Sequence, residues 1–252
     1  MRALRTLVLS SRPLSWVNTA VPFALAYYVV TESFDPIFVV GSIFFLIPYN
    51  FLMYGINDVF DYESDLRNPR KGGVEGALLP PDLHRATLVA SVALSAPFVA
   101  VLVWWGTVAS TGILALSLFF VVAYSAKGLR FKEIPFLDSL TSGAHFVMPA
   151  VFGLAVAGAS PSWSAFTLLV AFFLWGMASH AFGAVQDVLA DREAGLSSIA
   201  TAIGAAGAVR FALFAYAAAG LVMLTTPPPL PLIAPTVVLY IAAVLPWWRV
   251  TD

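Results

Sequence analysis

The chain has 252 residues, of which 60% are hydrophobic and 11% are charged, and its net charge at pH 7 is −1. Soluble domains carry about 25% charged residues, so this composition excludes an ordinary soluble domain and predicts a protein of the lipid bilayer. Cysteine is absent, which excludes disulfides, thiolate metal sites and cysteine nucleophiles. Nothing in this balance predicts a nucleic-acid partner.

Apolar stretches long enough to cross a bilayer core, about 20 residues each, follow one another along the chain. Eight such spans can be read, at 13–31, 36–57, 84–105, 107–125, 139–158, 162–185, 204–224 and 231–248. The first is too long for the core of a signal peptide and should stay in the protein, with Pro22 as a point where it can kink. The sequence therefore predicts an all-α, multi-pass transmembrane helical bundle, with residues 1–252 forming a single domain.

Basic residues mark one side of the membrane. All 13 Lys and Arg residues are interpreted as lying in the N-terminal segment, in alternate loops or at the C-terminus, and the outer connections near 32–35, 106, 159–161 and 225–230 have none. Cytoplasmic loops of membrane proteins are enriched in Lys and Arg. We therefore expect an integral protein of the cell membrane with both termini and its acidic motifs on the cytoplasmic side.

Four acids and an amide follow the second apolar stretch, in "YGINDVFDYESDLRNPRKGG" at residues 54–73. If a helix continues past Tyr54, its advance of about 100° per residue places one set of side chains within an arc of about 100°, with Glu63 directed elsewhere. This set is Asn57, Asp58, Asp61 and Asp65.

A second acidic motif occurs in "SHAFGAVQDVLADREAG". Asp187 and Asp191 are one helical turn apart and share a face, and His180 lies two turns earlier on nearly the same line. The two motifs suggest a faint internal duplication, because each follows a helical hairpin.

Clustered carboxylates repel one another unless a cation lies among them. Oxygen ligands without Cys favour Mg²⁺ or Mn²⁺, and Mg²⁺ commonly completes its shell with substrate phosphates. The two acidic motifs therefore predict a metal-bridged diphosphate, and two basic loops supply cations for the remaining phosphate oxygens. These cations are Arg67, Arg70 and Lys71, and Lys127, Arg130 and Lys132.

For other polar residues a structural role competes with a functional one. A loop Arg or Glu can simply be solvated, and His84, His145 and His180 can be satisfied interior or interfacial histidines, with His180 the best candidate of the three. Asn18, Tyr54, Tyr124 and Gln186 can line a pocket or pair with polar groups between helices.

At the two motifs the sequence resembles the UbiA superfamily of intramembrane prenyltransferases. The first family motif, NDxxDxxxD, matches Asn57, Asp58, Asp61 and Asp65, and the second, DxxxD with a following Gly, matches Asp187, Asp191 and Gly195. The resemblance implies a helical bundle around a central cavity, typically of nine spans, in which Mg²⁺ holds a prenyl diphosphate.

The resemblance also implies roles for individual residues. Metal ligands would be Asn57, Asp58, Asp61, Asp65, Asp187 and Asp191, among which Asp58, Asp61, Asp187 and Asp191 would be catalytic. Substrate-binding residues would be Asn57, Arg67, Tyr124, Lys127, Arg130, Lys132 and His180.

The phrases "NPRKGGVEGALLPP" and "SHAFGAVQDVLADREAG" are similar to the lycopene elongase branch, which builds C50 carotenoids. This similarity implies Mg²⁺-dependent transfer of a dimethylallyl group from its diphosphate to the terminal alkene of lycopene, with membrane lipids around the protein and in some cases a second membrane subunit. Two alternatives remain open at this point. One is transfer to an aromatic, quinone or tetrapyrrole acceptor, although an acidic acceptor would favour a basic residue inside a span, and none was identified. The other is a cation transporter, although its acids would have to continue across the membrane.

Overall fold

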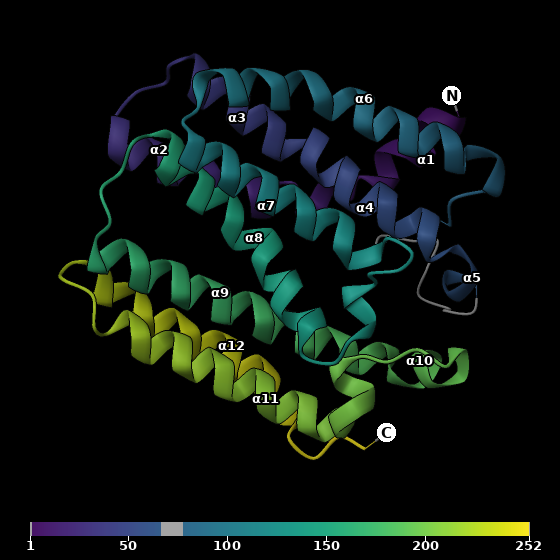
Figure 1. Ribbon diagram of the computed structural model, residues 1–252. Helices are drawn as coiled ribbons and strands as arrows, with labels where there is room; N and C mark the ends of the chain where they lie inside the picture. The colour runs from purple at the N-terminus through teal and green to yellow at the C-terminus, as the bar shows by residue number, and fades with distance from the viewer. Residues whose placement is uncertain (1, 67–77, 252) are drawn as a thin grey trace. The chain divides into compact units, whose positions relative to one another are not determined.

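The computed structural model describes residues 2–66 and 78–251, and all regular structure in these residues is helical, which confirms the predicted all-α class (Figure 1). Contacts divide the chain into two compact units, Met1–Arg130 with Met148–Ala159, and Phe131–Val147 with Ser160–Asp252. The single domain expected over 1–252 stays a prediction.

The first unit contains the helices that lead to and follow the first acidic motif. They are α1 (Arg2–Ser10), η1 (Pro13–Ser15), α2 (Val17–Thr31), α3 (Pro36–Leu46), α4 (Pro48–Phe60), α5 (Tyr62–Asp65), α6 (Pro81–Trp105), α7 (Val108–Ser125) and the last part of α8 (Leu137–Val156). Inside this unit α2 packs on α3, and α4 packs on α1, α6 and α7.

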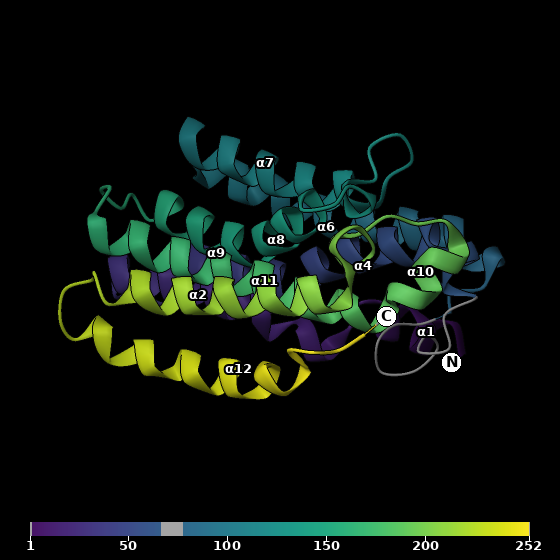
Figure 2. The same cartoon turned by 90° about the horizontal axis from the view of Figure 1, so that it is seen from below.

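The second unit contains the helices around the second motif. They are η2 (Phe131–Glu133), the first part of α8, α9 (Trp163–Ala184), η3 (Val185–Asp187), α10 (Val188–Ala194), α11 (Ile199–Met223), η4 (Leu230–Thr236), α12 (Val237–Val244) and η5 (Leu245–Trp247). Helices α9 and α11 run side by side, and α12 lies along α11, in both Figure 1 and Figure 2.

Seven helical segments of the described residues are long and apolar enough to cross a membrane, and an eighth is obtained if α1 with η1 and α2 count as one span bent by 55°. The predicted number of about eight is therefore confirmed. The first span differs in detail from the prediction, because its break lies at Trp16 while Pro22 sits inside α2. The seventh begins earlier than predicted, at Ile199, and changes direction at Gly204, which has φ +75°.

The reading that no span interior contains a basic residue is wrong at Arg210. This residue lies in the middle of α11, which is one of the candidate spans. Its side chain is exposed and its guanidinium carbon lies 5.0 Å from the ring centre of Trp248. A long cationic side chain can remain on an apolar helix when it reaches along the surface to an aromatic ring. Position 210 falls within the span predicted at 204–224, so the span and the assignment of every basic residue to a loop disagree there, and the structure supports the span.

The core of the first unit is an aromatic cluster, and the second span is interrupted between α3 and α4. Phe23, Phe45 and Phe152 are fully buried, and the ring centre of Phe23 lies 5.1 Å from that of Phe45 and 5.9 Å from that of Phe152. The second span breaks at Pro48, which has no N–H to continue the helical hydrogen bonds. The Asn50 side chain satisfies the break by donating to the Phe45 carbonyl at 2.8 Å.

Asp35 stabilises the connection between α2 and α3. Its carboxylate accepts hydrogen bonds from the backbone N–H groups of Ile37 and Phe38 at the start of α3, and from the Tyr27 hydroxyl at 2.7 Å. Burial opposes the charge of Asp35, but the hydrogen bonds from Phe38, Tyr27 and Ile37 outweigh it and lower the pKa of the carboxyl below its ordinary value. The charged form is therefore the one that the fold favours.

We expect Asp35→Ala to lower the stability at neutral pH by about 1 kcal/mol, the usual cost of losing a helix cap. Because the folded-state pKa is lowered, the contribution is present above the ordinary pKa and is lost as the pH falls through the lowered one. Thermal unfolding in detergent as a function of pH checks this, with Glu32→Gln at the exposed neighbouring acid as the control. If the difference in unfolding temperature between Asp35→Ala and the parent protein is the same at acid and neutral pH, the charged Asp35 carboxylate does not stabilise the fold in this way.

Candidate functional site

The first motif lies at the end of α4, which continues to Phe60, past the end of the span predicted at 36–57. Asp61 has φ −100° and ψ 0°, so α4 ends at Phe60 and the short helix α5 begins at Tyr62. The condition of a helix that continues past Tyr54 therefore holds as far as Phe60, and Asp65 belongs to the next short helix. Asp58, Asp61 and Asp65 are nevertheless all buried, at 1%, 4% and 7% exposure, which marks them off from solvated loop acids.

Asn57 and Asp61 form the centre of the first motif. The Asn57 amide nitrogen donates to a carboxylate oxygen of Asp61 at 2.6 Å and to the Ser125 hydroxyl at 3.1 Å. The guanidinium of Arg130 lies 3.7 Å from the other Asp61 oxygen and donates to the Phe60 carbonyl at 3.4 Å. The structure thus brings together three predicted residues, Asn57, Asp61 and Arg130.

Asp58 points to different partners from those of Asp61. It accepts a hydrogen bond from the Ser10 hydroxyl at 2.7 Å and forms an ion pair with Arg12 at 2.8 Å. The Arg12 guanidinium also lies 4.4 Å from the ring centre of Tyr54, and 3.5 Å from the amide oxygen of Asn57. Asp58 and Asp61 therefore belong to the same motif but contact different side chains, Ser10 and Arg12 for Asp58, and Asn57 and Arg130 for Asp61.

The remaining predicted residues of the first unit differ in their surroundings. Tyr124 is half-buried near the end of α7, and Lys127 is exposed in the turn that follows. Arg67 lies outside the described residues, as do Arg70 and Lys71. Of the predicted loop cations of this unit, the structure therefore places Arg130 beside the motif.

In the second unit His180 is held by a close crossing of α8 and α9. A Cβ atom on Gly176 would lie 2.9 Å from the Cα of Gly143, so the two backbones approach at this point. One helical turn from each glycine, the Ser139 hydroxyl and the Nδ1 atom of His180 are 3.1 Å apart. His180 also interacts electrostatically with Asp187, so the predicted neighbours are brought together.

Because a methyl group at Gly176 would meet backbone rather than a flexible side chain, we expect Gly176→Ala to destabilise the protein by about 1–3 kcal/mol. The matched control is Gly112→Ala in α7, where a Cβ would have nothing within 4 Å. Thermal unfolding of both variants in the same detergent measures the difference. Equal unfolding temperatures for the two variants would show that the α8–α9 crossing does not depend on glycine.

The second motif is divided between η3 and α10. Asp187 ends the 3₁₀ turn, and Asp191 lies in the first turn of α10. Asp191 interacts electrostatically with Asp187 and with Lys132, a predicted diphosphate-binding residue. Gly195, with φ +69°, then ends α10 in the left-handed conformation that glycine favours. The helix α9 changes to the 3₁₀ turn after Ala184, close to the end of the span predicted at 162–185.

Several residues at the two motifs were not predicted. Ser10, Arg12 and Ser125 contact the first motif, and Asp138 and Ser139 belong to the second unit. Asp138 is fully buried, and one of its oxygens accepts from the backbone N–H of Ile199 at 2.6 Å, at the start of α11. Arg12 and Asp138 carried a weak signal as charges close to apolar stretches. Their partners are distant in the chain, at separations of 46 and 61 residues, so no local pattern identifies them.

The donors of both motifs fit a hard divalent cation in kind. They are carboxylate and amide oxygens, the ligands that Mg²⁺ prefers. Among the described residues of the chain, however, no three His, Asp or Glu side chains converge on one point. A magnesium ion at either motif would therefore need Asn57, water or a phosphorylated substrate to complete its shell.

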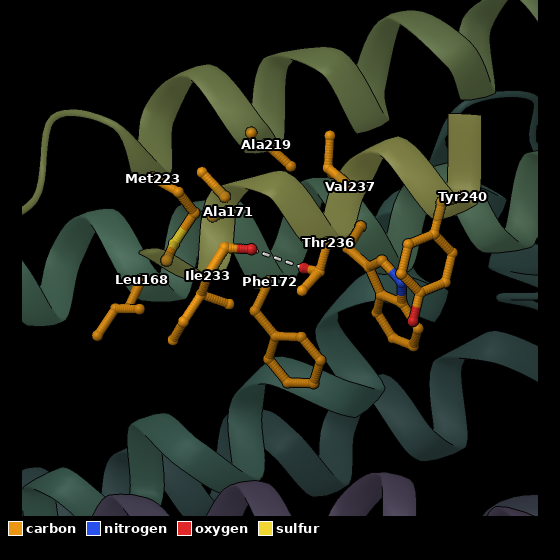
Figure 3. Close-up of a pocket in the computed structure, with 12 residues that line it drawn as sticks. Leu168, Ala171, Phe172, Ala219, Met223, Ile233, Thr236, Val237 and Tyr240 are labelled. Carbon is orange, nitrogen blue, oxygen red and sulfur yellow. Dashed lines mark hydrogen bonds between the residues drawn. The ribbon is translucent and has the colours of Figure 1, made fainter. Parts of the chain in front are cut away.

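The second unit contains an apolar pocket of about 340 Å³, and none of the acidic residues of the two motifs lines it. It is formed by α9, α11, η4 and α12, and its lining includes Phe172, Trp175 and Tyr240. Figure 3 shows the rings of Phe172 and Tyr240, and the hydrogen bond of 2.7 Å from the Thr236 hydroxyl to the Ile233 carbonyl. No residue predicted for the metal or the diphosphate lines it.

Comparisons with known proteins agree with the motifs. The family model of the UbiA prenyltransferase family matches residues 19–252. A C(50) beta-cyclic carotenoids biosynthesis protein of Dietzia sp. is 60% identical over 250 residues, which cover 99% of this chain and 58% of that protein. A lycopene elongase/hydratase of Corynebacterium glutamicum is 53% identical over 252 residues, covering 100% of this chain and 88% of that one.

Solved structures give the same fold. The structure of a UbiA homolog from Archaeoglobus fulgidus bound to DMAPP and Mg²⁺ has a TM-score of 0.74 and 20% identity, over 96% of this chain and 85% of that one. The apo structure of a UbiA homolog from Aeropyrum pernix has a TM-score of 0.68 and 20% identity, and the match covers 92% of this chain and 86% of that one. With its two acidic motifs, its helical architecture and a match over most of its length, this chain belongs to the UbiA prenyltransferase family.

Proposed function

We propose that the protein transfers a dimethylallyl group from dimethylallyl diphosphate to the terminal alkene of lycopene, in the biosynthesis of C50 carotenoids. The observation that carries this proposal is the hydrogen bond from half-buried Asn57 to buried Asp61, with Arg130 beside it, in a chain that is similar over its full length to a lycopene elongase/hydratase. Buried acids next to a cation are costly to maintain in a membrane protein without a function.

In the proposed site the first motif binds metal through Asn57, Asp61 and Asp65, and the second through Asp187 and Asp191. Bound Mg²⁺ would neutralise the charge that develops on the departing diphosphate. Mn²⁺ has similar ligand preferences and is expected to substitute. The sequence also predicts Asp58 as a ligand and a catalytic residue, and in the structure its carboxylate forms an ion pair with Arg12.

The basic residues of the proposal bind phosphate oxygens. Arg130 is suited to this because a guanidinium donates two parallel hydrogen bonds to an oxyanion. Its guanidinium lies 3.7 Å from Asp61, beside the first motif. Lys127 and Lys132 act in the same way, as does Arg67. Tyr124 and His180 are assigned to the organic part of the substrates.

The reaction breaks the C–O bond between the prenyl group and the diphosphate, and the electron pair leaves with the diphosphate. The terminal alkene of lycopene then forms a C–C bond with the allylic cation, and the new tertiary cation is quenched by water or by loss of a proton. Apolar surroundings limit premature capture of the allylic cation by water, and aromatic rings stabilise it. The cytoplasmic orientation of both motifs and a second membrane subunit stay predictions.

The test is production of the chain in membranes that already accumulate lycopene, followed by mass spectrometry of the extracted pigments. We expect lycopene to gain one or two five-carbon units, with or without water. The same membranes carrying Asp61→Asn are the control. If correctly inserted protein produces no five-carbon addition, lycopene is the wrong acceptor, and transfer to an aromatic, quinone or tetrapyrrole acceptor becomes the next activity to assay.

A further inference from the structure

The first acidic motif contains two kinds of carboxylate. Asp61 has an amide donor at 2.6 Å and a guanidinium nitrogen at 3.7 Å. Asp58 has strong donors on both oxygens, the Ser10 hydroxyl at 2.7 Å on one and Arg12 at 2.8 Å on the other. A charge-assisted hydrogen bond of this length is among the strongest that side chains form. Asp58 is therefore already bound by a cation of the chain itself.

Arg12 is held in this position by the bend in the first span. It follows the end of α1 with φ +51° and ψ 72°, a left-handed conformation that is uncommon for arginine. Next to it the Trp16 indole N–H donates to the Ser11 carbonyl at 3.0 Å, which ties the two sides of the bend together. The bend thus directs the Arg12 side chain toward α4.

The ion pair is largely shielded from water. The Arg12 side chain is 17% exposed and that of Asp58 is not exposed at all. Removing one partner of a buried pair leaves an uncompensated charge, which is strongly destabilising. A divalent cation that coordinated Asp58 would either displace Arg12 or lie within a few ångströms of its positive charge, and both are unfavourable. These contacts separate Asp58 from the metal-binding role of its neighbours.

We propose that Arg12 and Asp58 form a positioning pair that fixes the bend of the first span to α4, and that Asp58 is not a magnesium ligand. The pair acts through Asn57, whose amide oxygen lies 3.5 Å from the Arg12 guanidinium and whose amide nitrogen donates to Asp61. Arg12 thereby orients the amide and, through it, the carboxylate that binds metal. This inference rests on the proposed function only in taking the first motif as a metal site.

The test is Mn²⁺ binding to purified protein in detergent, followed by electron paramagnetic resonance, in four single variants. Asp61→Asn removes a ligand and should raise the Kd by more than about tenfold. Arg12→Met removes the orienting partner and should raise it by about tenfold, as loss of an outer partner typically does. Arg12→Lys keeps the charge and should restore most of the affinity. Asp58→Asn retains an acceptor for Arg12 and should change the Kd by less than about threefold.

The outcomes are distinct from one another. If Asp58→Asn weakens binding as much as Asp61→Asn, Asp58 is a ligand and the inference is overturned. If Arg12→Met strengthens Mn²⁺ binding, Arg12 competes with the metal. If Arg12→Met leaves the Kd for Mn²⁺ unchanged, Arg12 has only a structural role. Either result overturns the inference. If Asp61→Asn leaves Mn²⁺ binding unchanged, the metal site of the proposed function itself is wrong. Arg12→Lys and Asp58→Asn preserve most contacts and serve if Arg12→Met does not fold.

Discussion

Replacing Asp61 or Asp187 with Asn is expected to lower turnover by about 10³-fold without loss of folded protein. An amide has nearly the same shape as a carboxylate but lacks its charge, so it binds Mg²⁺ weakly and leaves the charge on the diphosphate uncompensated. In Asp61→Asn the side chain can still accept from Asn57, which preserves the local fold. Turnover is measured as prenylated pigment per amount of monodisperse protein.

Matched controls lie in the same two motifs. Glu63 and Glu193 are exposed acids, and Glu63→Gln and Glu193→Gln change the net charge by the same amount as the two aspartate variants. We expect these controls to retain most of the turnover. Activity that survives Asp61→Asn, or that falls equally in Glu63→Gln, would contradict the assignment of the buried carboxylates to metal binding.

Removal of divalent cations is the second change with a large expected effect. Chelation with EDTA should reduce turnover to background, and Mg²⁺ or Mn²⁺ should restore it, because the carboxylates within each motif repel one another and would repel the proposed diphosphate when no metal is present. The expected loss is again about 10³-fold, because in the proposed reaction the metal would supply most of the electrostatic stabilisation of the leaving group.

The assay for this prediction uses membrane vesicles that contain lycopene and added dimethylallyl diphosphate. Circular dichroism before and after chelation serves as the control, since the helices are held by packing and backbone hydrogen bonds and should not unfold. Turnover that is insensitive to EDTA would exclude a metal-assisted departure of the diphosphate, whatever the acceptor.

Much of the helical layout could be predicted because it depends on local composition. A helix in a bilayer satisfies its own backbone, so a run of about 20 apolar residues is sufficient to predict it. The breaks were harder to predict. Pro48 interrupts the second span and Asp61 ends α4, but Pro22 and Pro97 lie inside continuous helices. Whether a proline breaks a helix depends on whether a side chain such as Asn50 supports the break.

The amino-acid sequence by itself determined the class of this protein, because apolar length dictates membrane helices, and its clustered oxygen donors predict a hard cation. It also brought Asn57 and Asp61 together, since residues four apart lie on one helical face. Only the tertiary structure decided that Arg12 pairs with Asp58, that Arg130 lies beside Asp61, and that Asp138 meets the start of α11. These contacts join segments 46 to 69 residues apart, counting 130 − 61 for the longest, and such contacts depend on how helices pack and not on any periodicity within one of them.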